Sequence, residues 1–304
     1  MLTEVGWLGV GVMLACISSS ALNVNASSNP RKTADQQHAS AASTPMIRGY
    51  VEGEKLSYLM KGVNEDWRYQ IQGDGVVKKD AAGAFFEEYH WSHLISNHGQ
   101  TLTSTSEAFR QELSLDPRHK IVLPNFAQAP PVLIGPMTDM LTFYSDALLA
   151  QSLSNRGDHK YVKWGGPNSW TDGNYVLLGE DSIDFDVSLT KIDGDAKTFS
   201  IVVHHVPPQQ QVINLPAEWM RTPVGNSPNN WIEIKKVNGK YIAGVGKETF
   251  DVEMTLSLTD GKILSGKLDN TVDQVYRTCS DAKLENCGPP APHKIRRDIE
   301  IKLQ

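Results

Sequence analysis

The amino-acid sequence predicts a mainly β fold of the α+β class, in which a curved antiparallel sheet or half-barrel holds one central helix. Two segments, Ile183–Thr190 and Phe250–Thr259, alternate strictly between apolar and polar residues. This two-residue period is typical of strands that bury one face and expose the other. One earlier segment, residues 136–154, repeats its apolar residues at helical spacing instead. The contrast between these two periods predicts the fold class.

The segments before the helix predict paired strands. Leu56–Val63 and Trp67–Gln72 are rich in apolar and aromatic residues, and Gly73–Gly75 predicts a tight turn after them. The run Thr101–Leu113 predicts a further strand that stops at Asp116. We therefore expect hairpins in the N-terminal part of the folded chain.

The segments after the helix predict more strands, separated by two long loops. Lys163–Tyr175 is rich in Gly, Asn, Pro and Trp, and several prolines interrupt Pro207–Asn230, so both are predicted to be loops. The dipeptide Asn238–Gly239 is favoured in two-residue hairpin turns. Strands are expected at Phe199–Val206, Trp231–Val237, Tyr241–Val245, Phe250–Leu258, Lys262–Leu268 and Ile299–Leu303.

The predicted helix is apolar on more than one side. Pro136 fits its first turn, where a missing N–H group costs nothing. One stripe along it consists of Met137, Met140, Leu141, Tyr144 and Leu148, and its other side carries Phe143, Ala147, Leu149 and Ala150. A helix inside the curve of a sheet is covered on two sides, so we expect it there.

Length and charge limit the class of protein. A chain of 304 residues suits a single antiparallel β-rich domain over residues 46–304, behind an N-terminal leader. The 29 basic and 35 acidic residues give a net charge of −6, so the overall field attracts neither nucleic acid nor an anionic membrane. We expect no nucleic-acid partner.

The N-terminus predicts export. Val5–Ile17 is mostly apolar but shorter than the roughly 20 residues that cross a bilayer as a helix, which suits a signal peptide or lipoprotein leader over residues 1–26. Glu4 departs from the usual positive start of such a leader. Residues 27–45 are small and polar and predict a disordered tether.

The fate of the leader has three interpretations. Met13–Cys16 is similar to a bacterial lipobox, which would lead to lipidation of Cys16 and to membrane anchoring through the N-terminus. Ordinary cleavage between Ser18 and Ala26 would release the domain, and the third interpretation is an ordinary buried segment. The predicted location is periplasmic, secreted, or membrane-anchored as a lipoprotein.

The two cysteines outside the leader predict a disulfide. Cys279 and Cys287 flank the polar segment Ser280–Asn286 and precede Gly288. An exported chain meets an oxidising environment, so the two thiols are expected to pair.

No motif in the sequence names a reaction. The densest group of candidate metal ligands is Glu87, Glu88, His90, His93 and His98, but its spacing lacks the HExxH pattern, so no metal site and no cofactor are predicted. His204 and His205 lie together at a strand end, and the chain has no GxSxG turn to supply a nucleophile. Catalytic residues remain unassigned, and a non-enzyme is the favoured prediction.

The order of elements resembles the half-barrel of periplasmic lipoprotein carriers and related lipid-binding lipoproteins. The resemblance covers roughly Ile47 to Leu303 and is architectural, so it carries no functional residue to this chain. It implies a curved sheet that wraps a helix around an apolar cavity. The amino-acid sequences of two segments, Gly73–Tyr89 and Cys279–Arg297, also resemble those of uncharacterised secreted bacterial proteins. This resemblance implies export alone.

The predicted function is that of a non-catalytic exported binding protein for a lipid or other apolar small molecule. The inward residues of a curved sheet offer more apolar area than one helix covers, so a groove of ligand size is expected between helix and sheet. The candidate ligand-binding residues are Phe85, Phe86, Trp91, Met140, Tyr144, Phe185, Phe250 and Met254. The alternatives are an extracytoplasmic hydrolase that uses His90, His93 or His204, and a structural or interaction domain. Two loop tryptophans, Trp164 and Trp170, are further candidates for ligand stacking.

Overall fold

The computed structural model describes residues 47–99, 101–102, 110–119, 130–165, 169–171, 174–180 and 182–304. The predicted leader, its Cys16 and the tether lie outside these residues, so what was expected of them stays a prediction.

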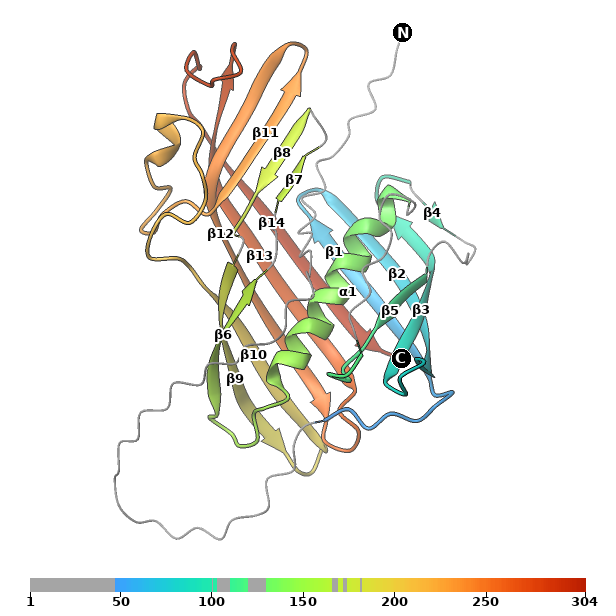
Figure 1. Cartoon of the computed structure of the whole chain (residues 1–304). Coiled ribbons are helices and arrows are strands. Elements are labelled where there is room, and N and C mark those ends of the chain that lie inside the picture. The colour runs from blue at the N-terminus through green and yellow to red at the C-terminus, as the bar shows by residue number, and fades with distance from the viewer. Residues whose placement is uncertain are drawn as a thin grey trace, which may run out of the picture.

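The protein is mainly β, as predicted, and its described strands form one antiparallel sheet of fourteen strands (Figure 1). The strands are β1 (Lys55–Asn64), β2 (Trp67–Lys79), β3 (Phe85–Ser96), β4 (Thr101–Leu102), β5 (Arg110–Leu113), β6 (His159–Gly165), β7 (Ser169–Thr171), β8 (Tyr175–Leu178), β9 (Ser182–Asp193), β10 (Thr198–Val206), β11 (Trp231–Val237), β12 (Lys240–Ser257), β13 (Ile263–Cys279) and β14 (Ala291–Leu303). Their order is β4-β3-β2-β1-β14-β13-β12-β10-β9-β6, with β5 beside β3. β11 also pairs with β12, and β8 and β7 follow it.

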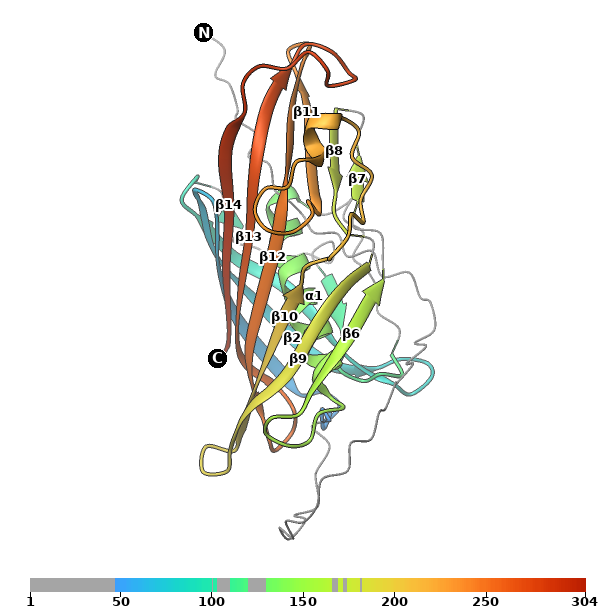
Figure 2. The same cartoon turned by 90° about the vertical axis from the view of Figure 1, so that its left-hand side faces the viewer.

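The sheet has two parts that share the long strands β12 and β13. One edge of β12 pairs with β10 from Asp251 to Ser257 and with β11 from Lys240 to Gly246. We call β7, β8, β11 and the adjoining ends of β12, β13 and β14 the extension, and the rest of the sheet with its helix the main part. Figure 2 shows β12 and β13 running through both parts.

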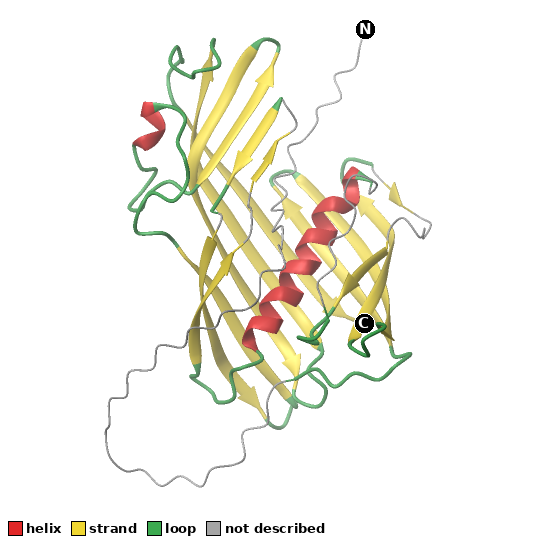
Figure 3. Ribbon diagram, viewed as in Figure 1, coloured by secondary structure: helices red, strands yellow, loops and turns green. Residues whose placement is uncertain are grey.

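The single α-helix of the described residues, α1 (Pro131–Ala150), crosses one face of the main part diagonally (Figure 3). We call this face the inner face and the opposite one the outer face. The predicted bounds of 136–154 were shifted, because Pro131 rather than Pro136 occupies the first turn. Either proline fits a first turn. Pro136 lies inside the helix, where it removes one backbone hydrogen bond.

One predicted turn was wrong. Gly73–Gly75 lies in the middle of β2, and the actual hairpin turn is at Glu65–Asp66. A Cβ atom at Gly75 would stand 2.5 Å from the Tyr89 ring, so glycine is needed there to let an aromatic ring lie flat on the neighbouring strand. Glycine in a sequence is compatible both with a turn and with a strand position where a neighbouring side chain packs directly on the backbone.

One predicted loop was also wrong in part. Within the segment 163–175, the described residues contribute the end of β6, all of β7 and the start of β8. The second predicted loop, 207–230, holds no strand but includes a short 3-10 helix, η2 (Glu218–Arg221). The two-residue turn at Asn238 and Gly239 was correct, and both residues have positive φ.

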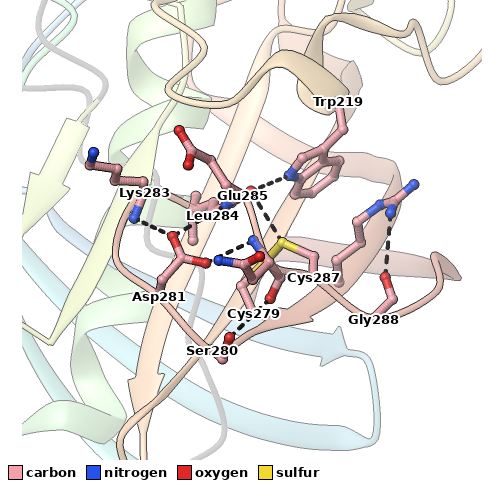
Figure 4. Close-up of a disulfide and its surroundings, with 11 residues drawn as sticks. Trp219, Cys279, Ser280, Asp281, Lys283, Leu284, Glu285, Cys287 and Gly288 are labelled. Carbon is pink, nitrogen blue, oxygen red and sulfur yellow. Dashed lines mark hydrogen bonds between the residues drawn. A yellow bond between two sulfur atoms is a disulfide. The ribbon is translucent and has the colours of Figure 1, made fainter.

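The predicted disulfide between Cys279 and Cys287 is present (Figure 4). It closes a loop in which the Asp281 carboxylate accepts backbone N–H groups, including that of Asn286 at 2.7 Å. The carbonyl of Leu284 in the same loop accepts the Trp219 indole N–H at 3.1 Å. A disulfide is compatible with an exported protein. No helix among the described residues has the length and apolar character needed to span a membrane.

Candidate ligand-binding site on the inner face of the sheet

The structure brings six of the eight predicted ligand-binding residues into the core that the inner face forms with α1. These six are buried, and they are Trp91, Met140, Tyr144, Phe185, Phe250 and Met254. Phe85 packs against this core and stacks on Tyr50 at 5.4 Å between ring centroids. Phe86, its neighbour in β3, faces the opposite side and stacks on His119 at 4.9 Å. Successive residues of a strand point to opposite faces, so these two rings do not line one cavity.

The void found where α1 contacts the sheet at β5 is far smaller than the groove of ligand size that the sequence predicts between helix and sheet. A void of about 10 Å³ lies at the contact of α1 with β5, lined by residues that include Leu113, Leu141 and Tyr144. One water molecule needs about 10 to 15 Å³ on this measure. A hollow of ligand size, about 580 Å³, lies instead on the outer face of the main part, where Lys61, Glu253 and Lys267 are among its lining residues.

The first polar contact between α1 and the sheet is at Glu87. Its carboxylate accepts hydrogen bonds from the Tyr144 hydroxyl of α1 and from the Tyr89 hydroxyl, the latter at 2.8 Å. The Arg48 guanidinium lies 3.3 Å away and also pairs with Glu54 at 2.6 Å. Burial raises the pKa of Glu87, and Arg48 opposes that rise. The contact fixes the helix against β3 by hydrogen bonds rather than by apolar packing alone.

The second polar contact joins Asp139 of α1 to Arg297 of β14. The two side chains form a buried ion pair, and the Tyr69 hydroxyl donates to Asp139 at 3.0 Å. Burial raises the pKa of Asp139, while Arg297 and Tyr69 lower it. Arg297 also donates to Asn270 at 3.3 Å, and Asn270 donates to Glu248 at 3.0 Å. Helix and sheet are thus connected by a continuous chain of buried polar groups.

The second carboxyl group of α1, that of Asp146, has no cation or hydrogen-bond donor among the residues that the structure describes that offsets its burial at Oδ2. The side chain is 3 % exposed, and its Oδ2 has no hydrogen-bond partner. Burial alone raises its pKa to about 8, so at neutral pH the group is mostly protonated while α1 is docked. Docking the helix therefore carries a cost that an apolar residue at this position would avoid.

Another buried polar cluster fills the break between β10 and β11 along the edge of β12. The Asn230 side chain takes the place of a strand there, because it accepts the Glu248 N–H at 2.7 Å and donates to the Glu248 carbonyl at 3.1 Å. Asn230 also donates to Glu180 at 2.6 Å, and Glu180 lies 2.9 Å from His205 Nε2. Burial raises the pKa of Glu248 to about 7, against the hydrogen bond from Asn270.

This cluster adjoins the predicted aromatic residues. The His205 ring stacks on Phe250 at 5.0 Å between centroids, and Phe250 meets Phe185 edge to face at 5.2 Å. The inner face of β12 therefore changes along its length from the carboxyl of Glu248 to an apolar track over Phe250, Val252 and Met254. Such a surface suits a ligand with a polar end and an apolar body.

The residues expected to carry hydrolase chemistry are dispersed. His90 lies 3.3 Å from Glu88 on the face opposite to Glu87, and His93 is exposed with positive φ at a β-bulge. His204 is exposed and lies 2.6 Å from Asp251. In the described part of the chain, no three His, Cys, Asp or Glu residues lie where they could hold a metal ion. The side chains of Trp164 and Trp170 fall outside the described residues.

Sequence reasoning missed the buried carboxyl groups. Asp139 and Asp146 are seven residues apart on the helix, which places both on one side, and Glu248 precedes Phe250 by one strand period. The sequence signal that could have identified them is an acidic residue at a position where the apolar pattern of the helix or strand points inward.

The comparisons with known proteins add no family. The chain matches no protein-family model, and no curated protein matches it.

Proposed function

We propose that the protein is an exported, non-catalytic binding protein for a lipid or other apolar ligand, and that α1 moves off the inner face to admit it. The observation that carries the proposal is the uncompensated carboxyl of Asp146 on the helix that covers the apolar inner face. A helix that served only to fill the core would gain stability from an apolar residue at this position.

The balance between a docked and a displaced helix follows from the buried carboxyl. Docking α1 at neutral pH takes up a proton at Asp146, whose pKa of about 8 lies well above its ordinary value of 3.8. Each unit of that difference is worth about 1.4 kcal/mol against docking once the free carboxyl is ionised. Displacement returns the carboxyl to water and exposes the apolar track of β12 to a ligand.

The two compensated contacts define the docked position. The Tyr144–Glu87 hydrogen bond and the Asp139–Arg297 ion pair are directional, so they hold the helix in one register. They favour return of α1 to the same place after the ligand leaves. The resemblance to lipid-binding half-barrel proteins and the disulfide, which suits an oxidising compartment, support an exported carrier in the same way.

The test is binding of an uncharged fluorescent probe, N-phenyl-1-naphthylamine, to the full-length chain. We expect saturable binding that Asp146→Leu weakens about tenfold or more, because the variant stabilises the docked helix and lowers the population that accepts a ligand. Asp195→Leu, the same substitution in an exposed turn, is the matched control and should leave the affinity unchanged.

Two results would contradict the proposal. Unchanged probe affinity in an Asp146→Leu variant whose melting temperature has risen would mean that α1 stays in place during binding. Absence of saturable binding would leave the alternative of an interaction domain, which the hollow of about 580 Å³ on the outer face favours. Substitution of its lining residues Glu253 and Lys267 would then be the next measurement.

A further inference from the structure

Unpartnered buried polar atoms gather around Glu248, where the main part joins the extension. Among the described residues, nine buried side-chain nitrogen and oxygen atoms lack a hydrogen-bond partner. Four of these belong to three residues that neighbour Glu248 on the inner face: His205 Nδ1, Trp231 Nε1, and both Nε2 and Oε1 of Gln274. Buried polar groups are usually paired, so their concentration at one place calls for a partner.

Strand register places these groups on one face. Trp231 faces Gly246 across one strand pair, and Gly246 faces Gln274 across the next, so the two side chains flank a glycine on the same face. Neighbouring strands are about 4.8 Å apart, which puts their backbones about 10 Å from each other. Glu248 lies one strand period along β12 from Gly246, and His205 stacks on Phe250 one period further.

Gly246 is needed for this arrangement. A Cβ atom there would stand 2.6 Å from the Cβ of Gln274 and 2.2 Å from the Asp273 carbonyl oxygen. With glycine, β13 approaches β12 closely, and Gln274, which pairs with Gly246, lies on the face of the sheet that carries Trp231 and Glu248.

The unpartnered atoms offer both donors and acceptors. Trp231 has an indole N–H that only donates, and the Gln274 amide both donates and accepts. His205 Nε2 lies 2.9 Å from the Glu180 carboxylate, which can only accept, and Nδ1 of the same ring has no partner in the described part of the structure. The carboxyl of Glu248 uses one oxygen to accept from Asn270. A partner group must therefore both give and take hydrogen bonds.

We propose that this cluster binds the head group of an amphiphilic ligand, and that the head is uncharged and hydrogen-bonding, such as a primary amide. The inference rests on the proposed function, because the tail would run along the apolar track of β12 over Phe250, Val252 and Met254, beneath the position of α1. Glu248, within the polar cluster, and Phe250, the first residue of the track, occupy successive inward positions of β12.

Charge complementarity selects against the ionised alternatives. A carboxylate head would take the donors of Trp231 and Gln274 but would face Glu248 and Glu180, which are both buried. An ammonium head would pair with Glu248 but would offer no hydrogen-bond acceptor to the N–H groups of Trp231 and Gln274. Arg297, the nearest cation in the chain of hydrogen bonds, is already paired with Asp139. An amide head can accept a hydrogen bond from Trp231 or Gln274 through its oxygen and donate one to Glu248 through its nitrogen.

The experiment compares three ligands with one C18 tail, oleamide, oleate and oleylamine, as competitors of N-phenyl-1-naphthylamine on the full-length chain. We expect oleamide to bind at least about tenfold more tightly than either ionised ligand. Gln274→Leu and Trp231→Phe should each reduce that preference to within about threefold. Gln70→Leu, at an exposed position of β2, is the matched control and should keep the preference.

The outcomes separate the two proposals. Equal affinity for the three ligands, tighter binding of oleylamine or oleate, or a preference that survives both Gln274→Leu and Trp231→Phe would overturn the head-group inference while leaving a binding protein. Failure of the probe and of all three ligands to bind would overturn the proposed function and the inference together.

Discussion

The largest apolar cluster of the main part and that of the extension lie on opposite faces of the same strand, β12. In the main part, the inward residues of β12, such as Phe250 and Met254, are buried with α1. In the extension, the residues of the other parity, Ala243 and Val245, are buried against the outer-face segment 207–230 and the disulfide loop. Because alternate residues of a strand point to opposite faces, one strand can contribute to two cores when the segment that covers it lies on one face at one end and on the other face at the other end.

The two covers differ in how they are held. The helix of the main part is apolar but packs with three buried carboxyl groups. Glu87 of β3 accepts from Tyr144, Asp139 pairs with Arg297, and Oδ2 of Asp146 has no hydrogen-bond partner within the described residues. The cover of the extension is irregular and is attached through the disulfide loop, where Trp219 of η2 bonds to Leu284. Polar contacts therefore hold the main-part cover, whereas a covalent bond closes the loop that contacts the extension cover.

The largest effect is expected from breaking the ion pair in the main part. Arg297→Met leaves Asp139 buried beside Tyr69 without its cation, which should lower the free energy of unfolding by about 3 to 5 kcal/mol. Urea denaturation measures the loss. Arg296→Met, at the adjacent exposed position, should cost less than about 1 kcal/mol, because surface ion pairs contribute little.

A second variant sharpens that prediction. Adding Asp139→Leu to Arg297→Met removes the unpaired charge and should recover much of the lost stability. A double variant as unstable as Arg297→Met alone would mean that the buried charge of Asp139 was not the cause.

The next effect concerns the extension. Replacing both Cys279 and Cys287 by serine should cost about 2 to 3 kcal/mol for a loop this short, in the chain-entropy model. Hydrogen exchange should increase in η2, β11 and the ends of β12 and β13, while α1 keeps its protection. Equal loss of protection in α1 would show that the two covers depend on each other.

A third effect is a slope of stability with pH that originates at Asp146. The folded carboxyl has a pKa of about 8 and the unfolded one about 3.8, so the unfolded chain loses its proton first. Stability is therefore highest below about pH 4 and falls as pH rises towards 8, by about 1.4 kcal/mol per pH unit from this group. Asp146→Asn should remove that share of the slope, and an unchanged slope would mean that another group titrates.

The sequence by itself determined the elements whose signal is local. Alternation at Ile183–Thr190 predicts a strand, apolar spacing from Met137 to Leu148 predicts a helix, and Asn238–Gly239 predicts a hairpin, because period and turn chemistry depend on neighbouring residues only. The pairing of Cys279 with Cys287 was equally accessible, since they are the two cysteines outside the leader and lie close in the chain.

Only the tertiary structure decided which faces meet and what each buried polar residue contacts. Gly73–Gly75 predicts a turn locally, yet the ring of Tyr89 from another strand requires glycine there. The partners of Asp139 and Glu248 come from residues distant in sequence, so no local pattern identifies them. A periodic pattern shows that a residue points inward, but the pairing and cost of a buried charge depend on which strands the chain brings beside it.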